Sequence, residues 1–220
     1  MTIAAVIFDF GGVIVPGSPA DGANSPFTPI EEAHGLPQGF IWRAIYLDNP
    51  AWLRLRVGEG TEAGWLAAAE GRLEATAGTT AAALAMAAFA QTRPQGSALA
   101  GKPPAFNAGM IDLLGRLRPR YRVGLLSNAA PGLEAELRDH YSIDHLFDDI
   151  VNSATVRLAK PDPRIFRVAA ERIGVAIERC FFTDDLAHNV EAASAAGMTA
   201  HVFDGAAGLL EALRAAGVEA

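Results

Sequence analysis

Cysteine is almost absent from this chain of 220 residues, and no basic, cleavable leader precedes its first apolar segment. The lone Cys180 cannot form a disulfide within the chain, which excludes the disulfide framework of a small secreted domain. The missing leader argues against a secretory signal peptide. Both absences predict a protein of the reducing cytoplasm.

Positive charge is also scarce. Lys and Arg total 18 against 25 Asp and Glu, which leaves a formal net charge of −7. Nucleic acid and anionic membranes need a basic surface, so neither is an expected partner. No apolar run approaches the roughly 20 residues that would span a bilayer. We therefore expect a soluble globular protein, whose oligomeric state has no signature in the sequence.

The apolar residues are plentiful and are arranged as in an α/β domain. The chain is 50% hydrophobic, enough for one large domain or a core with one insertion. Residues 3–8 form a continuous apolar run, typical of a strand covered on both faces of a parallel sheet. Further strands are predicted over 123–126, 150–151, 180–183 and 199–203. Helices are predicted over 107–118, 131–140, 163–173, 187–196 and 206–216. Strands that alternate with helices predict a Rossmann-like parallel sheet flanked by helices.

Residues 16–104 have a different pattern, with no predicted strand. A loop rich in Pro and Gly occupies 16–29, and Thr28 with Pro29 and Glu31 predicts a capping box at the start of a helix that ends at Gly35. Further helices are predicted over 37–47, from 61 to about 73, and from 79 or 80 to before 93. An all-helical insertion, 16–104, is therefore expected to interrupt an α/β core made of 1–15 and 105–220.

Charged and polar side chains follow the predicted strands. Asp9 comes directly after the first strand and is followed by Gly11 and Gly12. Ligands of open parallel sheets sit beyond the carboxyl ends of the strands. The residues expected to converge there are Asp9, Ser127, Asn128, Lys160, Asp184 and Asp185.

In order and spacing these segments resemble the haloacid dehalogenase-like hydrolase superfamily, whose first motif is usually Asp-x-Asp. The resemblance implies that the helical insertion is a cap domain. Among its branches, the chain is most similar to the phosphatase domain at the N-terminus of soluble epoxide hydrolases. The second Asp of the family motif serves as general acid/base, and Gly11 stands in its place here.

The resemblance also implies roles for individual residues. Asp9 is the expected nucleophile, forming an aspartyl-phosphate. The expected cofactor is Mg²⁺, which prefers oxygen ligands. Its expected ligands are Asp9, Asp185 and the backbone carbonyl of Gly11, a group that glycine retains.

Other residues are assigned to the phosphate and to support of the site. The residues expected to bind the phosphate are Gly11, Gly12, Ser127, Asn128 and Lys160. Asp184 and Asn189 are expected to orient Asp185 or Lys160. General acid/base assistance is typically worth about 10²–10⁴-fold, so we expect a slow phosphatase of small phosphorylated metabolites, or one that favours good leaving groups. His188 or a cap residue could replace the missing acid.

Two other functions fit parts of the pattern. A 2-haloacid dehalogenase releases halide, which needs no proton, so Gly11 suits it. The resemblance implies for that branch no metal, Ser-Ser-Asn in the last motif and Tyr where this chain has Phe166. A non-catalytic module that binds a phosphorylated metabolite is also motivated by Gly11, but retention of Asp9 and Lys160 argues against it.

Overall fold

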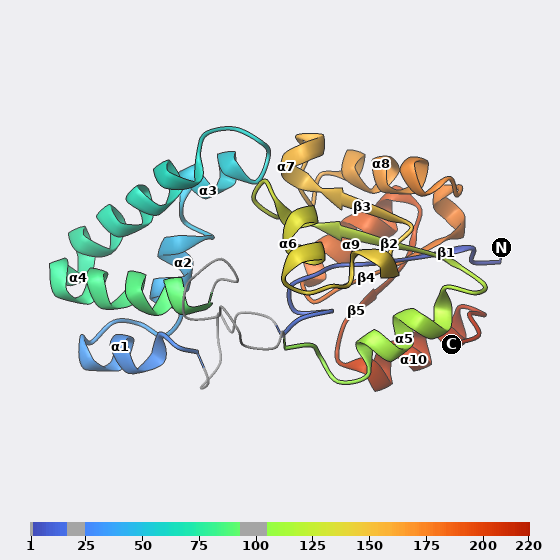
Figure 1. The fold of residues 1–220 in the computed structure, drawn as a ribbon, viewed down its shortest axis with the longest axis horizontal. Helices are drawn as coiled ribbons and strands as arrows, with labels where there is room; N and C mark the ends of the chain where they lie inside the picture. Colours follow the sequence, from blue (N-terminus) through green and yellow to red (C-terminus); the bar gives the residue numbers. More distant parts are fainter. Residues whose placement is uncertain (1, 17–24, 93–104) are drawn as a thin grey trace. The chain divides into compact units, whose positions relative to one another are not determined.

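The computed structural model describes residues 2–16, 25–92 and 105–220 (Figure 1). By their internal contacts the residues fall into two compact units, Met1–Gly17 with Pro104–Ala220, and Ser18–Pro103. The expected core was 1–15 with 105–220, and the expected insertion 16–104. Most of the loop predicted over 16–29 lies outside the described residues.

The first unit is built on a parallel sheet, as predicted. Its strands are β1 (Ala5–Phe8), β2 (Arg122–Ser127), β3 (Asp149–Asn152), β4 (Cys180–Asp184) and β5 (Thr199–Val202). All neighbours pair in parallel, in the order β3-β2-β1-β4-β5. Strand β1 is therefore central, and its carboxyl end lies between those of β2 and β4.

The apolar run of β1 is buried on both faces of the sheet. Val6 and Phe8 join one core cluster, while Ala5 and Ile7 join the other. Side chains alternate between the faces of a strand, so a strand covered on both sides needs apolar residues at every position. This is the physical reason why the run in residues 3–8 predicted the sheet.

Helices cover the two faces (Figure 1). They are α5 (Met110–Leu117), α6 (Leu133–Asp139), α7 (Ser153–Val156), α8 (Pro163–Ile173), α9 (Ala187–Ala196) and α10 (Ala206–Ala215). Residues of α5, α6 and α10 pack with Val6 and Phe8, and residues of α8 and α9 pack on the opposite face. The sequence pattern missed α7, because one helical turn has no detectable periodicity; the Asn152 side chain caps it by accepting from the Ala154 amide (3.0 Å).

The second unit is helical in its described part. It contains α1 (Thr28–Ala33), α2 (Phe40–Ile45), α3 (Pro50–Leu55) and α4 (Glu62–Thr92). The predicted capping box was wrong: Phe27 is the N-cap of α1, and the buried Glu31 carboxylate accepts from the amides of Gly39 (3.0 Å) and Ile41 (2.9 Å). These amides belong to the start of α2, where a helix favours negative charge.

The sequence has no apolar run near 20 residues, but among the described residues one helix, α4, is long and apolar enough on average to cross a membrane. By length and composition alone, its residues Glu62–Gln91 meet that criterion. Its many alanines keep the mean hydropathy high without any run of large apolar side chains. Gly78 (φ 82°, ψ 163°) breaks it into two helical halves, as the sequence predicted near Thr79. Its Trp65, Leu73 and Phe89 side chains are buried within the unit.

Candidate active site

The sheet register brings the sequence-predicted residues to one edge. Phe8 of β1 lies beside Leu125 of β2 and Thr183 of β4. Asp9, directly after Phe8, therefore lies level with the end of β2 and with Asp184, and its amide donates to the Thr183 carbonyl (2.9 Å). The residues that directly follow neighbouring parallel strands lie at the same edge of the sheet.

Lys160 joins two of these carboxylates in the interior. Its Nζ donates to Asp9 Oδ1 and to Asp184 Oδ2, each at 2.6 Å, and its exposed fraction is only 2%. Burial by itself lowers the pKa of Lys160, but the charges of Asp9 and Asp184 outweigh it and raise that pKa above its usual range. The two acids therefore favour the charged form of the ammonium that lies between them.

Asp184 is held rigidly on its other side. Its Oδ1 accepts from the Asn189 side chain (3.0 Å) and from the Leu186 amide (2.9 Å). Asn189 was expected to orient either Asp185 or Lys160; the structure places it on Asp184, which in turn contacts Lys160. This chain of hydrogen bonds fixes where the Lys160 ammonium meets Asp9.

The Asn128 side chain has a different contact from the expected one. Its Nδ2 donates to the Lys160 carbonyl and its Oδ1 accepts from the Lys160 amide, both at 2.9 Å. Because the Asn128 side chain both donates to and accepts from the backbone of Lys160, it positions Lys160. Ser127 remains at the buried end of β2, where its hydroxyl lies at the edge shared with Asp9.

The two glycines after Asp9 differ in whether the backbone requires them. Gly12 has a left-handed φ of 85°, and a Cβ built on it would lie 2.3 Å from Asp185 Oδ2. Only glycine lets the Asp185 carboxylate approach this loop. Gly11 lacks a left-handed φ, and a Cβ built there would meet nothing within 4 Å. The structure therefore demands glycine at position 12 and tolerates a side chain at position 11.

The donor set suits a divalent cation. Asp9, Asp184 and Asp185 each offer an oxygen, and these atoms lie within 4.8 Å of one another. Three carboxylates and one ammonium leave an excess of two negative charges when all are ionised. Burial raises the pKa of Asp9 to about 7; Lys160 opposes the rise and Asp184 adds to it. All-oxygen donors with excess negative charge fit Mg²⁺.

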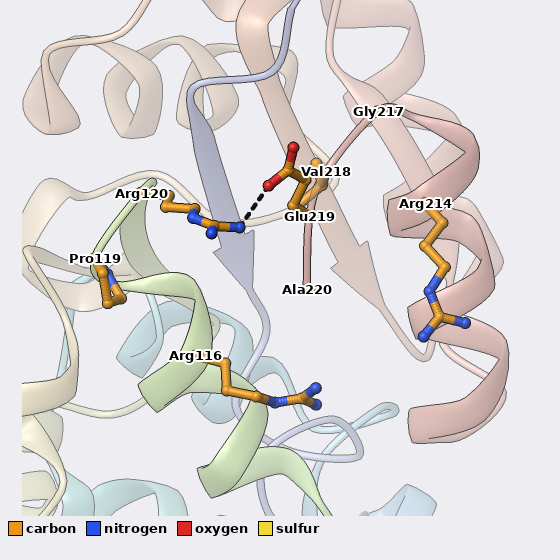
Figure 2. A pocket seen from close by; sticks show the side chains of 8 residues that line it. All are labelled: Arg116, Pro119, Arg120, Arg214, Gly217, Val218, Glu219 and Ala220. Carbon is orange, nitrogen blue, oxygen red and sulfur yellow. Dashed lines mark hydrogen bonds and ion pairs between the residues drawn. The ribbon is translucent and has the colours of Figure 1, made fainter.

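A cavity of about 730 Å³ lies elsewhere in the first unit. It is lined by Arg116, Pro119, Arg120, Arg214 and residues 217–220. Figure 2 shows Arg120 paired with Glu219 and the side chains of Arg116 and Arg214 in the same hollow. Arg120 comes just before β2 begins, so this cavity lies at the amino edge of the sheet, away from Asp9. It holds none of the predicted site residues.

Sequence reasoning missed Asn107, whose side chain donates to backbone carbonyls in the loop after Asp9. No sequence signal could have found it, because its partners lie more than 90 residues earlier in the chain.

Curated relatives share part of the chain. It is 38% identical over 84 residues to phosphatase MT3486 of Mycobacterium tuberculosis, a match that covers 38% of this chain and 39% of that protein. The chain thus aligns with less than half the length of this relative. The narrower resemblance to soluble epoxide hydrolases stays a prediction.

Solved structures share the fold over nearly the whole chain. The HAD family enzyme bt-2542 from Bacteroides thetaiotaomicron has a TM-score of 0.65 and 20% identity, covering 94% of this chain and 96% of that one. The L-2-haloacid dehalogenase RSc1362 has a TM-score of 0.62 and 22% identity, covering 91% and 86%. At such identities the likeness shows the fold alone. A family model for haloacid dehalogenase-like hydrolases matches residues 3–197, so this chain, with its five-stranded parallel sheet, belongs to that family and is a hydrolase.

Proposed function

We propose that this hydrolase is a Mg²⁺-dependent phosphatase of small phosphomonoesters, with Asp9 as nucleophile. The observation that carries the proposal is the buried Lys160 ammonium shared by Asp9 and Asp184 at 2.6 Å, beside the Asp185 carboxylate. The similarity to phosphatase MT3486 supports the reaction class. A structure of bt-2542 in complex with magnesium and inorganic phosphate supports the metal.

The residues divide the chemistry as follows. An Asp9 oxygen attacks phosphorus, the ester P–O bond breaks, and the alkoxide leaves with the bonding electron pair and takes a proton from solvent water. Water then cleaves the aspartyl-phosphate, which regenerates the Asp9 carboxylate and releases inorganic phosphate. Lys160 favours the charged form of Asp9 and neutralises phosphate oxygens, and Ser127 offers them a hydroxyl. Asp9, Asp185 and the Gly11 carbonyl would hold Mg²⁺, which supplies charge neutralisation for the transferred group.

The first test is whether turnover depends on Mg²⁺. We expect the protein to hydrolyse p-nitrophenyl phosphate when Mg²⁺ is present. The rate should fall to background with excess EDTA and should return when Mg²⁺ is restored. The excess negative charge at the site gives the reason, because a dianionic ester would otherwise meet two uncompensated charges. The rate is measured from the release of nitrophenol and inorganic phosphate.

A parallel assay addresses dehalogenation, which the likeness to RSc1362 and the absence of an acid at position 11 favour. Chloride release from L-2-chloropropionate in EDTA, without phosphate ester hydrolysis, would replace the phosphatase proposal. Tight phosphate binding with neither reaction would support the non-catalytic binding module.

Gly11→Asp is expected to raise turnover of esters with poor leaving groups by about 10²-fold. A Cβ at position 11 meets nothing within 4 Å, so the new carboxyl can be accommodated and can protonate the leaving oxygen. p-Nitrophenolate needs no proton, so its ester should change only a few-fold. kcat/KM measured across a series of aryl and alkyl phosphates should depend less steeply on leaving-group pKa.

Gly11→Asn is the matched control, since it has the same size but no acidic proton. An equal gain from Asn, or an equal gain on good and poor leaving groups, would contradict the explanation by a missing acid.

A further inference from the structure

We infer that Asn107 is a positioning residue for the candidate active site, because it binds the carbonyl oxygens of the loop that follows Asp9. Its Nδ2 donates to the carbonyls of Val13 (2.8 Å), Gly12 (3.0 Å) and Val15 (3.4 Å). Its backbone amide donates to the carbonyl of Ile14 (2.9 Å). One residue thus contacts the carbonyls of four consecutive loop residues.

The loop depends on these donors. Its amides are turned inward: Gly12 donates to the Val15 carbonyl (2.9 Å), and Ile14 (2.9 Å) and Val15 (3.1 Å) both donate to the Phe10 carbonyl. The carbonyls on its other side need partners from elsewhere, since unpaired backbone groups away from water are costly. A primary amide has two N–H groups, and those of Asn107 meet the carbonyls of Gly12 (3.0 Å) and Val13 (2.8 Å), while the more distant Val15 carbonyl (3.4 Å) also accepts from the Gly12 amide.

The same loop carries the candidate site. Asp9 stands at its start, and the Gly12 Cα lies against Asp185, so closely that a Cβ would be 2.3 Å from Oδ2. A shift of the loop therefore moves Asp9 relative to Lys160 and displaces the Asp185 carboxylate. Misplacement by about 1 Å can cost roughly 10²-fold in rate. Loop position is thus a determinant of site geometry.

Asn107 is itself anchored in the core unit. Its carbonyl accepts from the Met110 amide (3.1 Å) at the start of α5, and Met110 is fully buried. The loop leads toward the helical insertion and Asn107 lies on the chain returning from it. One side chain therefore ties together the segments that precede and follow the insertion, on the core side of both.

A residue that only stabilises the fold can be distinguished from one that positions the site by the effects of removing it. The first lowers the melting temperature and nothing else. The second also frees the loop locally and weakens the metal site. Removing groups that orient metal ligands typically costs 10–100-fold in affinity or activity, so Asn107→Ala is expected to weaken Mg²⁺ binding about 10-fold or more and to lower kcat more than it changes KM.

The experiment compares wild type, Asn107→Ala and Asn107→Asp with Asn49→Ala. Asn49 is a buried asparagine of the helical unit that pairs with the Ala51 amide (3.0 Å) and the Trp65 carbonyl (3.5 Å), so it controls for loss of a stabilising asparagine. Hydrogen exchange of the Gly12, Ile14 and Val15 amides is measured in EDTA, melting temperature by circular dichroism, Mg²⁺ binding by calorimetry, and turnover with p-nitrophenyl phosphate. Asn107→Asp should be worse than Ala, because it sets a carboxylate against three carbonyls; Asn107→Ser, which keeps one donor, serves if Asp does not fold.

The expected result is loop exchange faster by about tenfold, weaker Mg²⁺ binding and lower kcat in both Asn107 variants, with none of these changes in Asn49→Ala. Lower melting temperature alone, with exchange and Mg²⁺ binding as in wild type, would overturn the inference. The metal and rate readouts rest on the proposed function. A wild type without Mg²⁺ binding or turnover would count against that function, while the exchange of the loop amides in EDTA would still decide whether Asn107 holds the loop.

Discussion

Asp9→Asn should lower Mg²⁺-dependent p-nitrophenyl phosphate turnover by at least about 10⁴-fold, to the background rate. The amide has nearly the same shape but no anionic oxygen to attack phosphorus. Asp9 is buried, with an exposed fraction of 8%, and its Oδ1 meets Lys160 at 2.6 Å. An amide oxygen can still accept that hydrogen bond, and Lys160 keeps Asp184 as a counterion, so the variant should fold.

Asp149→Asn is the matched control. Asp149 lies at the amino end of β3, the edge of the sheet opposite Asp9, and pairs with Arg172 (2.8 Å). Its turnover should equal that of wild type. Kinetics of nitrophenol release and circular dichroism are the measurements. Persistent Mg²⁺-dependent turnover in a folded Asp9→Asn variant would show that another group is the nucleophile.

The sequence predicted the edge of the sheet where the site lies, for a local reason. The apolar run before Asp9 and the βα alternation after residue 105 depend on neighbours in the chain, and together they give a parallel sheet with one carboxyl edge. Asp9, Lys160 and Asp184 were therefore predicted to meet before any distance was known, and the ion pairs of 2.6 Å place them together.

The parts that sequence reasoning got wrong or missed are hydrogen bonds between distant segments. The sequence did not reveal that the Asn128 side chain pairs with the backbone of Lys160, 32 residues later, while its expected contact with phosphate stays a prediction. Glu31 was expected to cap its own helix, but its carboxylate instead accepts hydrogen bonds from two amides at the start of α2. A polar side chain has several possible partners, and the one chosen depends on tertiary packing, which local pattern does not encode.

The two glycines after Asp9 likewise show what the local sequence can predict and what depends on tertiary packing. Gly11 and Gly12 follow Asp9 closely, and the sequence alone does not distinguish one glycine from the other. Only the approach of Asp185 to Gly12, and the open space beside Gly11, distinguishes the obligatory glycine from the replaceable one. The loss of the family acid at position 11 is thus a chemical difference that the backbone does not require.

Lys160→Met, measured in EDTA at neutral pH, should destabilise the fold by about 3–5 kcal/mol, because removing one partner leaves buried charge uncompensated. Lys160 is 2% exposed, holds Asp9 and Asp184 at 2.6 Å, and lies 5.6 Å from the centroid of the Phe182 ring. Methionine fills similar space without a charge. Turnover should also be lost, because the Asp9 pKa rises further and the protonated acid is no nucleophile.

The sign of the pH dependence follows from Asp9. Its pKa is raised by burial from 3.8 to about 7, and removing Lys160, which lowers it, raises it more. Between the unfolded and folded pKa values the native state binds more protons than the unfolded state, so stability falls as pH rises. Wild type shares this fall up to about pH 7, so the penalty of Lys160→Met should be smallest below pH 7 and should grow above it, where only the variant keeps Asp9 protonated.

Urea unfolding of wild type and Lys160→Met across this pH range measures the penalty. Arg172→Met, which removes a cation paired with Asp149 at the surface, should differ from wild type by less than about 1 kcal/mol at every pH. A pH-independent penalty for Lys160→Met would mean that lost packing, rather than uncompensated charge on Asp9 and Asp184, causes the destabilisation. Lys160 would then not be the group that favours the ionised form of Asp9, and the assignment of Asp9 as an anionic nucleophile would lose its main physical support.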